Sequence, residues 1–139
     1  MINAKKTGNK KANSDALKEY NGSDIIAFPT AAGVKFYEKN AIVLFRSVSL
    51  KPAKRANWEV LLADNTKIKL PNNVTAEKIM NRLSNNSFFL INQSTIINHA
   101  YLGEVTFKSN VCLLIKPFDK IEFPVSRFQL TKMRAFFEI

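Results

Sequence analysis

Three stretches of the sequence carry side chains suited to directed contacts with nucleic acid. The first is a polar trio, Asn92-Gln93-Ser94, between two apolar runs at residues 88–91 and 95–97. The runs predict two strands, and the trio predicts the break between them. An amide side chain donates and accepts hydrogen bonds at once, as reading the edge of a base requires. The alternative is an ordinary polar surface loop.

The second stretch is a basic segment at residues 49–57, with the sequence SLKPAKRAN. Pro52 argues against a central strand, so we expect a loop. Cations on such a loop are suited to holding phosphates, and Asn57 at its end can bond a base. The three cations are Lys51, Lys54 and Arg55.

The third feature is Arg127, at the first position of a helix predicted over residues 127–137. A capping box, Ser126-x-x-Gln129, marks the start of this helix. A cation there opposes the helix dipole unless it faces an anion, and a guanidinium can grip a phosphate or guanine. The alternative is that Arg127 pairs with a surface carboxylate.

The charge of the chain favours a polyanionic partner. Its formal net charge is +10, of which residues 1–23 contribute +3, so that the rest of the chain is basic too. Nucleic acid is the expected partner of such a chain, although the charge could also serve only solubility. No apolar run reaches the roughly 18 residues of a membrane helix, and the N-terminus is no signal peptide, so we expect a cytoplasmic protein.

The sequence matches no template for catalysis or metal binding. His99 is the single histidine and is expected to be structural, which excludes a triad or a multi-histidine site. Cys112 lies in the apolar run VCLLI and is predicted to be a buried hydrophobe. We therefore expect no enzyme, no cofactor, no metal and no small-molecule substrate.

The hydrophobic pattern predicts a basic, disordered tail at residues 1–23, with a turn or two of helix, and a mainly β domain at 24–139. A mid-chain helix is predicted over 74–83, with Thr75 as its cap, and Phe128, Leu130, Met133, Phe136 and Phe137 form the apolar face of the last helix. The predicted strands cover residues 25–29, 34–37, 41–48, 58–63, 67–70, 88–91, 95–97, 102–108, 111–115 and 121–125.

The order of these pieces resembles the LytTR family of bacterial DNA-binding domains, over about residues 25–137. The resemblance implies a mainly β fold of about ten short strands in three small sheets, with a mid-chain and a C-terminal helix. The motifs that carry it are Phe88-Phe89, Ser94, Ile96-Ile97-Asn98 and Val125-Ser126-Arg127.

The family implies DNA contacts from loops in successive major grooves, by two copies on repeated half-sites. Carried over to this chain, the contacts come from Asn57 with Lys54 and Arg55, from Gln93 with Asn92, and from Arg127, while Lys51 would join the phosphate contacts. Ser94, Asn98 and Ser126 are expected to be structural.

The sequence departs from the family at two of these positions. Members usually carry a basic residue or histidine just before the motif serine, where this chain has Asn92-Gln93, and often histidine at Asn57. Without room for a receiver or sensor, the chain is expected to be a stand-alone regulator, favoured by Met1 and the tail, or a fragment of a longer one.

The rival functions are a protein-interaction module that has lost the reading of DNA sequence and a basic β RNA-binding domain. Against RNA binding, the aromatic residues fall mostly at core-like positions.

Overall fold

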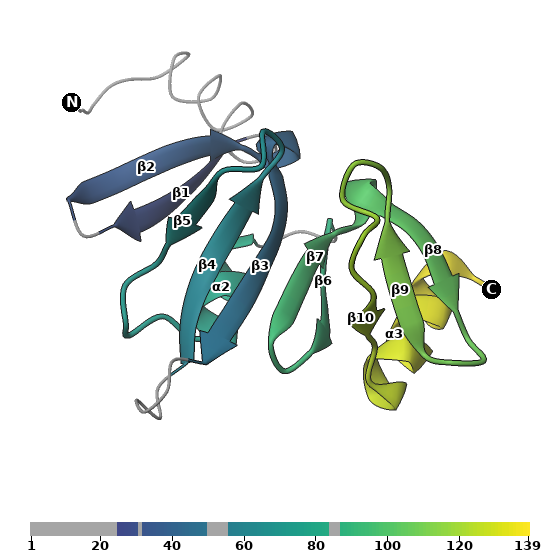
Figure 1. Cartoon of the computed structure of the whole chain (residues 1–139). Coiled ribbons are helices and arrows are strands. Elements are labelled where there is room, and N and C mark those ends of the chain that lie inside the picture. The colour runs from purple at the N-terminus through teal and green to yellow at the C-terminus, as the bar shows by residue number, and fades with distance from the viewer. Residues whose placement is uncertain (1–24, 31, 50–55, 84–86) are drawn as a thin grey trace, which may run out of the picture.

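The computed structural model describes residues 25–30, 32–49, 56–83 and 87–139. This part of the chain forms three antiparallel sheets with two α-helices against them (Figure 1). The tail and the cations Lys51, Lys54 and Arg55 lie outside the described residues.

The central sheet has five strands in the order β5-β4-β3-β7-β6. Its strand β7 is buried along its whole length, because both faces of the sheet are covered there. The strands are β3 (Ile42–Ser49), β4 (Ala56–Leu62), β5 (Lys67–Lys69), β6 (Phe88–Asn92) and β7 (Thr95–Asn98).

One face of the central sheet is covered by helix α2 (Ala76–Leu83) and by the hairpin of β1 (Ile25–Thr30) and β2 (Gly33–Glu38). Phe45 at the centre of this core packs its ring 5.0 Å from that of Phe28 and 5.9 Å from that of Phe88. From α2, Ile79 and Leu83 enter the same core, so the helix seals this face.

The other face packs on the third sheet and on helix α3 (Arg127–Phe137). A register shift between Ile42 and Leu44 lets Val43 and Leu44 both point into this second core. The third sheet has the order β10-β9-β8, with β8 (Leu102–Thr106), β9 (Val111–Leu114) and β10 (Phe123–Pro124).

The expected fold class is confirmed, with ten strands in three small sheets over the described ranges. Helix α2 begins at Ala76, and the Thr75 hydroxyl accepts a hydrogen bond from the Lys78 amide at 3.2 Å, as expected of its cap. The last strand is shorter than predicted, because only Phe123 and Pro124 pair with β9.

The predicted apolar face of the last helix is wrong in part. Leu130 and Met133 are buried, but Phe128 is 66% exposed. Phe128 lies two residues before Leu130, about 200° around the helix axis, so the two side chains cannot share one face. Phe136 and Phe137 are partly exposed and pack instead around Phe89 and His99.

Candidate nucleic-acid interface

The β6–β7 hairpin turns at Gln93-Ser94, and Asn92 holds the turn from within. The Asn92 amide nitrogen donates to the Pro124 carbonyl at 2.6 Å, and its oxygen accepts from the Ser94 amide at 2.7 Å. Both ends of this side chain therefore bond backbone. Gln93 beside it is exposed, and its side chain makes no hydrogen bond within the described part of the chain.

Backbone hydrogen bonds tie this hairpin to the strands on both sides. The Ser47 amide on β3 donates to the Ser94 carbonyl at 2.8 Å. The Ser126 amide, just before α3, donates to the Ile91 carbonyl at 2.9 Å. The turn is thereby fixed between the end of β3 and the start of α3.

Arg127 is exposed at the first position of α3. The Ser126 hydroxyl caps this helix by accepting from the Gln129 amide at 3.3 Å, as predicted. No acidic residue lies in the first turn of the helix. The guanidinium has no ion pair with any acid among the described residues, so the alternative of a paired surface arginine is not observed. Its charge is available to an external anion.

Asn57 is half-buried on β4, opposite Val48 on β3. Its neighbour Trp58 is buried in the first core, so Asn57 projects from the other face of the sheet. In Figure 1 the end of β3, the start of β4, the β6–β7 turn and the start of α3 lie along one lower edge of the molecule. We call this edge the lower edge; it brings Asn57, Gln93 and Arg127 to one end of the fold.

Two residues near this edge were missed in the sequence. Phe128 follows Arg127 and exposes its ring, with the Lys132 ammonium 4.7 Å from the ring centre. Arg46 lies on β3 between Glu59 of β4 and Thr95 of β7. The helical period could have separated Phe128 from Leu130, whereas nothing in the apolar strand pattern singled out Arg46.

The aromatic side chains are less uniformly buried than expected. Phe28, Phe45, Phe88 and Phe123 are buried, but Phe36 and Phe128 are 68% and 66% exposed. Two rings are therefore open to stacking on bases, as binding of single-stranded RNA requires.

The residues that could suggest chemistry lie in packed surroundings. Cys112 is fully buried, and burial raises the pKa of its thiol from 9.0 to about 11. His99 stacks on Phe137, with ring centres 6.2 Å apart, and meets Phe89 edge-on. In the described part of the chain no group of three His, Cys, Asp or Glu side chains could hold a metal ion.

Asn98 has the structural role predicted for it. It is 1% exposed, and its amide donates to the carbonyls of Ile42 at 2.9 Å and Lys39 at 3.2 Å. Its oxygen accepts from the Ala100 amide at 3.0 Å. Asn98 thus joins the end of the hairpin to the start of β3.

No helix in the described ranges is long and apolar enough to cross a membrane.

Comparison with known proteins gives matches that include the β6–β7 hairpin and α3. The family model of the LytTr DNA-binding domain matches residues 73–138, which include Gln93 and Arg127 but not Asn57. Among solved structures, the chain is similar to the LytTr DNA-binding domain of a Bacillus cereus protein described as a methyl-accepting/DNA response regulator. That match has a TM-score of 0.61 at 14% identity and covers 84% of this chain and 98% of that one. No curated protein sequence matches the chain. By its motifs, its fold and the match over residues 73–138, the chain resembles the LytTr DNA-binding domain family.

Proposed function

We propose that this protein is a transcription regulator that binds specific sequences of double-stranded DNA in the cytoplasm. In this proposal, loops on the lower edge enter successive major grooves. Gln93 bonds a base edge, Arg127 bonds guanine or a phosphate, and Asn57 contributes from the start of β4. Lys51, Lys54 and Arg55 hold phosphates nearby.

The main support is that Gln93 and Arg127 are exposed, without partners among the described residues, on segments joined by hydrogen bonds. The Ser126–Ile91 bond fixes the helix start against the hairpin, and the Asn92 bonds fix the turn. Such fixed positions limit the conformational entropy lost when the side chains meet a base.

The hydrogen bonds of Asn92 support a smaller part in base contact for Asn92 than for Gln93. An amide that already donates to Pro124 and accepts from Ser94 keeps one hydrogen and one lone pair, and it cannot turn without breaking both bonds. We therefore assign base contact in the hairpin to Gln93 and positioning of the turn to Asn92.

A selection from random duplex DNA at moderate salt tests the proposal directly. We expect enrichment of a motif, repeated if two copies bind together, and an affinity that falls steeply with salt as counterions are released. Lys54→Ala should weaken all sequences alike. Failure to enrich any motif would refute the sequence-specific function.

A second candidate is a protein-interaction module, favoured by the outer face of the β1–β2 hairpin. The cross-strand pairs Ala27–Phe36 and Pro29–Val34 place apolar side chains there, and Val34 and Phe36 are 57% and 68% exposed. A stable protein complex together with no salt-dependent retention on DNA would favour this function.

RNA binding is a further alternative. A gel-shift competition between duplex DNA and single-stranded RNA tests whether exposed rings such as Phe128 bind bases instead.

A further inference from the structure

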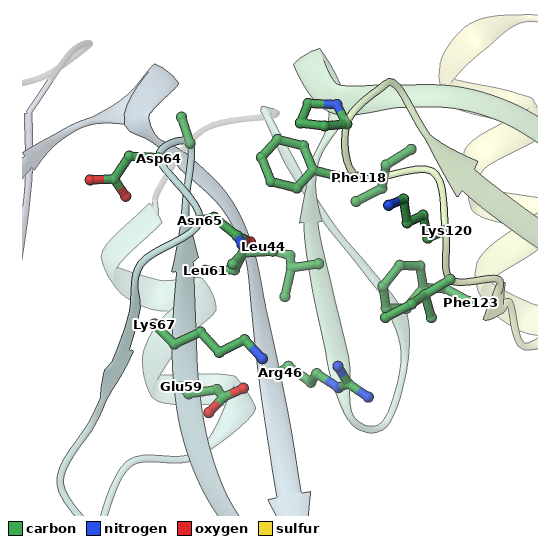
Figure 2. Close-up of a pocket in the computed structure, with 14 residues that line it drawn as sticks. Leu44, Arg46, Glu59, Leu61, Asp64, Asn65, Lys67, Phe118, Lys120 and Phe123 are labelled. Carbon is green, nitrogen blue, oxygen red and sulfur yellow. The ribbon is translucent and has the colours of Figure 1, made fainter.

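A groove of about 510 Å³ opens between the central sheet and the connection from β9 to β10 (Figure 2). Its floor is formed by Leu44 on β3 and Leu61 on β4, and its opposite wall includes Phe118, Ile121 and Phe123. The volume lies within the range of roughly 300–1,000 Å³ that small-molecule sites occupy. We call this cavity the sheet groove.

The sheet groove exists because the two faces of the central sheet are covered unequally. Val60 points into the first core and is 1% exposed, whereas its neighbour Leu61 on the other face is only half-buried. Beyond Leu61, the floor continues to Lys67 on the outermost strand β5. An apolar floor is thus left open along β3 and β4.

A cation lies at the lower end of this apolar floor. Arg46 is half-buried and lines the sheet groove, and its guanidinium makes no hydrogen bond or ion pair within the described residues. A half-buried guanidinium with free donors is a favourable partner for a carboxylate or phosphate. Figure 2 shows its side chain extending from β3 away from Glu59, toward the open side.

The charged side chains that line the groove leave one net positive charge, since Arg46, Lys67 and Lys120 stand against Glu59 and Asp64. Lys67 and Glu59 extend toward each other in Figure 2, while Asp64 points away from the groove. The Asp64 carboxylate accepts from the Thr66 amide at 2.9 Å within its own turn. Lys120 faces the groove from the wall opposite Arg46, which adds a second positive charge.

We propose that the sheet groove binds a small amphipathic anion. An aromatic or alkyl group lies on Leu61 and against Phe118, and a carboxylate or phosphate bonds Arg46, with Lys120 adding attraction from the opposite wall. Arg46 lies near the lower edge, but the lining of the sheet groove includes none of Asn57, Gln93 and Arg127, so this proposal does not depend on the proposed function.

The test is a titration of ¹⁵N-labelled full-length protein with 4-phenylbutyrate, followed by chemical shifts without DNA. We expect saturable shifts at the amides of Leu61 and Phe118 and at the Arg46 side chain, with a Kd of about 1 mM for a ligand of this size. The alcohol 4-phenyl-1-butanol should bind about tenfold more weakly because it lacks the charge. Acetate, which lacks the apolar group, should cause no saturable shift.

Variants identify the two halves of the site. Arg46→Gln should raise the Kd for 4-phenylbutyrate about tenfold, whereas the matched change Arg134→Gln, on the exposed side of α3, should leave it unchanged. Ile121→Asn should also weaken binding, and because Ile121 is 48% exposed this variant keeps its fold and tests the site even if Arg46→Gln does not fold.

Three results would overturn the proposal. They are equal binding of acid and alcohol, an unchanged affinity in Arg46→Gln or Ile121→Asn, and shifts that centre on Phe128 or Phe136 of α3. Because DNA is absent from every arm, failure here leaves the DNA selection unaffected, and failure of that selection leaves this result standing.

Discussion

The two ends of the β6–β7 hairpin carry the same kinds of side chain in opposite roles. At the open end, away from the turn, Asn98 is buried and its amide makes three hydrogen bonds to backbone. At the turn, Asn92 makes two such bonds, and the neighbouring Gln93 is exposed and makes none among the described residues. An amide in this fold therefore serves as scaffold or is free for a ligand according to the backbone groups within its reach.

The largest effect on stability should come from Asn98, at the open end of the hairpin. Asn98→Ala removes three hydrogen bonds to backbone, one of them buried and two part-buried, and should lower the free energy of unfolding by on the order of 3 kcal/mol. Urea denaturation followed by circular dichroism measures this. Asn81→Ala, an exposed asparagine on α2, is the matched control and should change stability by less than about 0.5 kcal/mol. A loss below 1 kcal/mol in Asn98→Ala would contradict the scaffold role.

Next in size is the effect at the start of α3. Arg127→Gln should reduce discrimination at one base pair by about 1–3 kcal/mol, because a bidentate contact is lost. Fluorescence anisotropy with the selected site and its single-base variants measures the loss. Stability should hardly change, since the guanidinium has no partner among the described residues. Arg134→Gln serves as control, and a uniform loss over all sequences would instead indicate a phosphate contact.

Asn92→Ala should have a smaller effect than Arg127→Gln, and it should weaken both folding stability and DNA binding. Losing the bonds to Pro124 and Ser94 should cost about 1 kcal/mol of stability, because both groups are near the surface and water can replace the side chain. Thermal unfolding measures the cost. Faster amide hydrogen exchange at Ser94 would show that the loss of stability lies in the turn. Unchanged exchange at Ser94 would contradict the role of Asn92 in positioning the turn.

The smallest effect on folding should come from Gln93→Ala, which should change the free energy of unfolding by less than about 0.5 kcal/mol. The same variant should lower base discrimination by about 1 kcal/mol, since one amide contact is removed. Urea denaturation measures the change in stability, and fluorescence anisotropy with the selected site and its single-base variants measures the change in discrimination. If Gln93→Ala destabilised the fold as much as Asn92→Ala does, the assignment of base contact to Gln93 and of turn positioning to Asn92 would be contradicted.

Much of the fold was predictable because its signals are local. Alternating apolar residues, turn pairs such as Asp64-Asn65 and Ser109-Asn110, and the caps Thr75 and Ser126 each act within a few residues. Asn65 and Asn110 have positive φ angles, 73° and 55°, and lie in the short gaps between the predicted strands 58–63 and 67–70 and between 102–108 and 111–115. The order of the motifs likewise carries the resemblance to the LytTR family without any contact between sheets.

The candidate site was predictable only in part. The residue types at Gln93 and Arg127 were visible, but the difference between Asn92 and Gln93 depends on the Pro124 carbonyl, 32 residues along the chain. The prediction of Asn57 and the three cations beside it rests on the resemblance, and the cations lie outside the described residues.

By itself, the sequence determined the strands, the two helices, their caps and the basic charge, because hydrogen bonding and side-chain alternation are set by near neighbours. Only the tertiary structure decided which amides are occupied and which faces are covered. Arg46 has no ion pair among the described residues, and the sheet groove is open because the third sheet covers only part of one face. Such coverage depends on how distant segments pack, and no periodicity within a strand or helix encodes it.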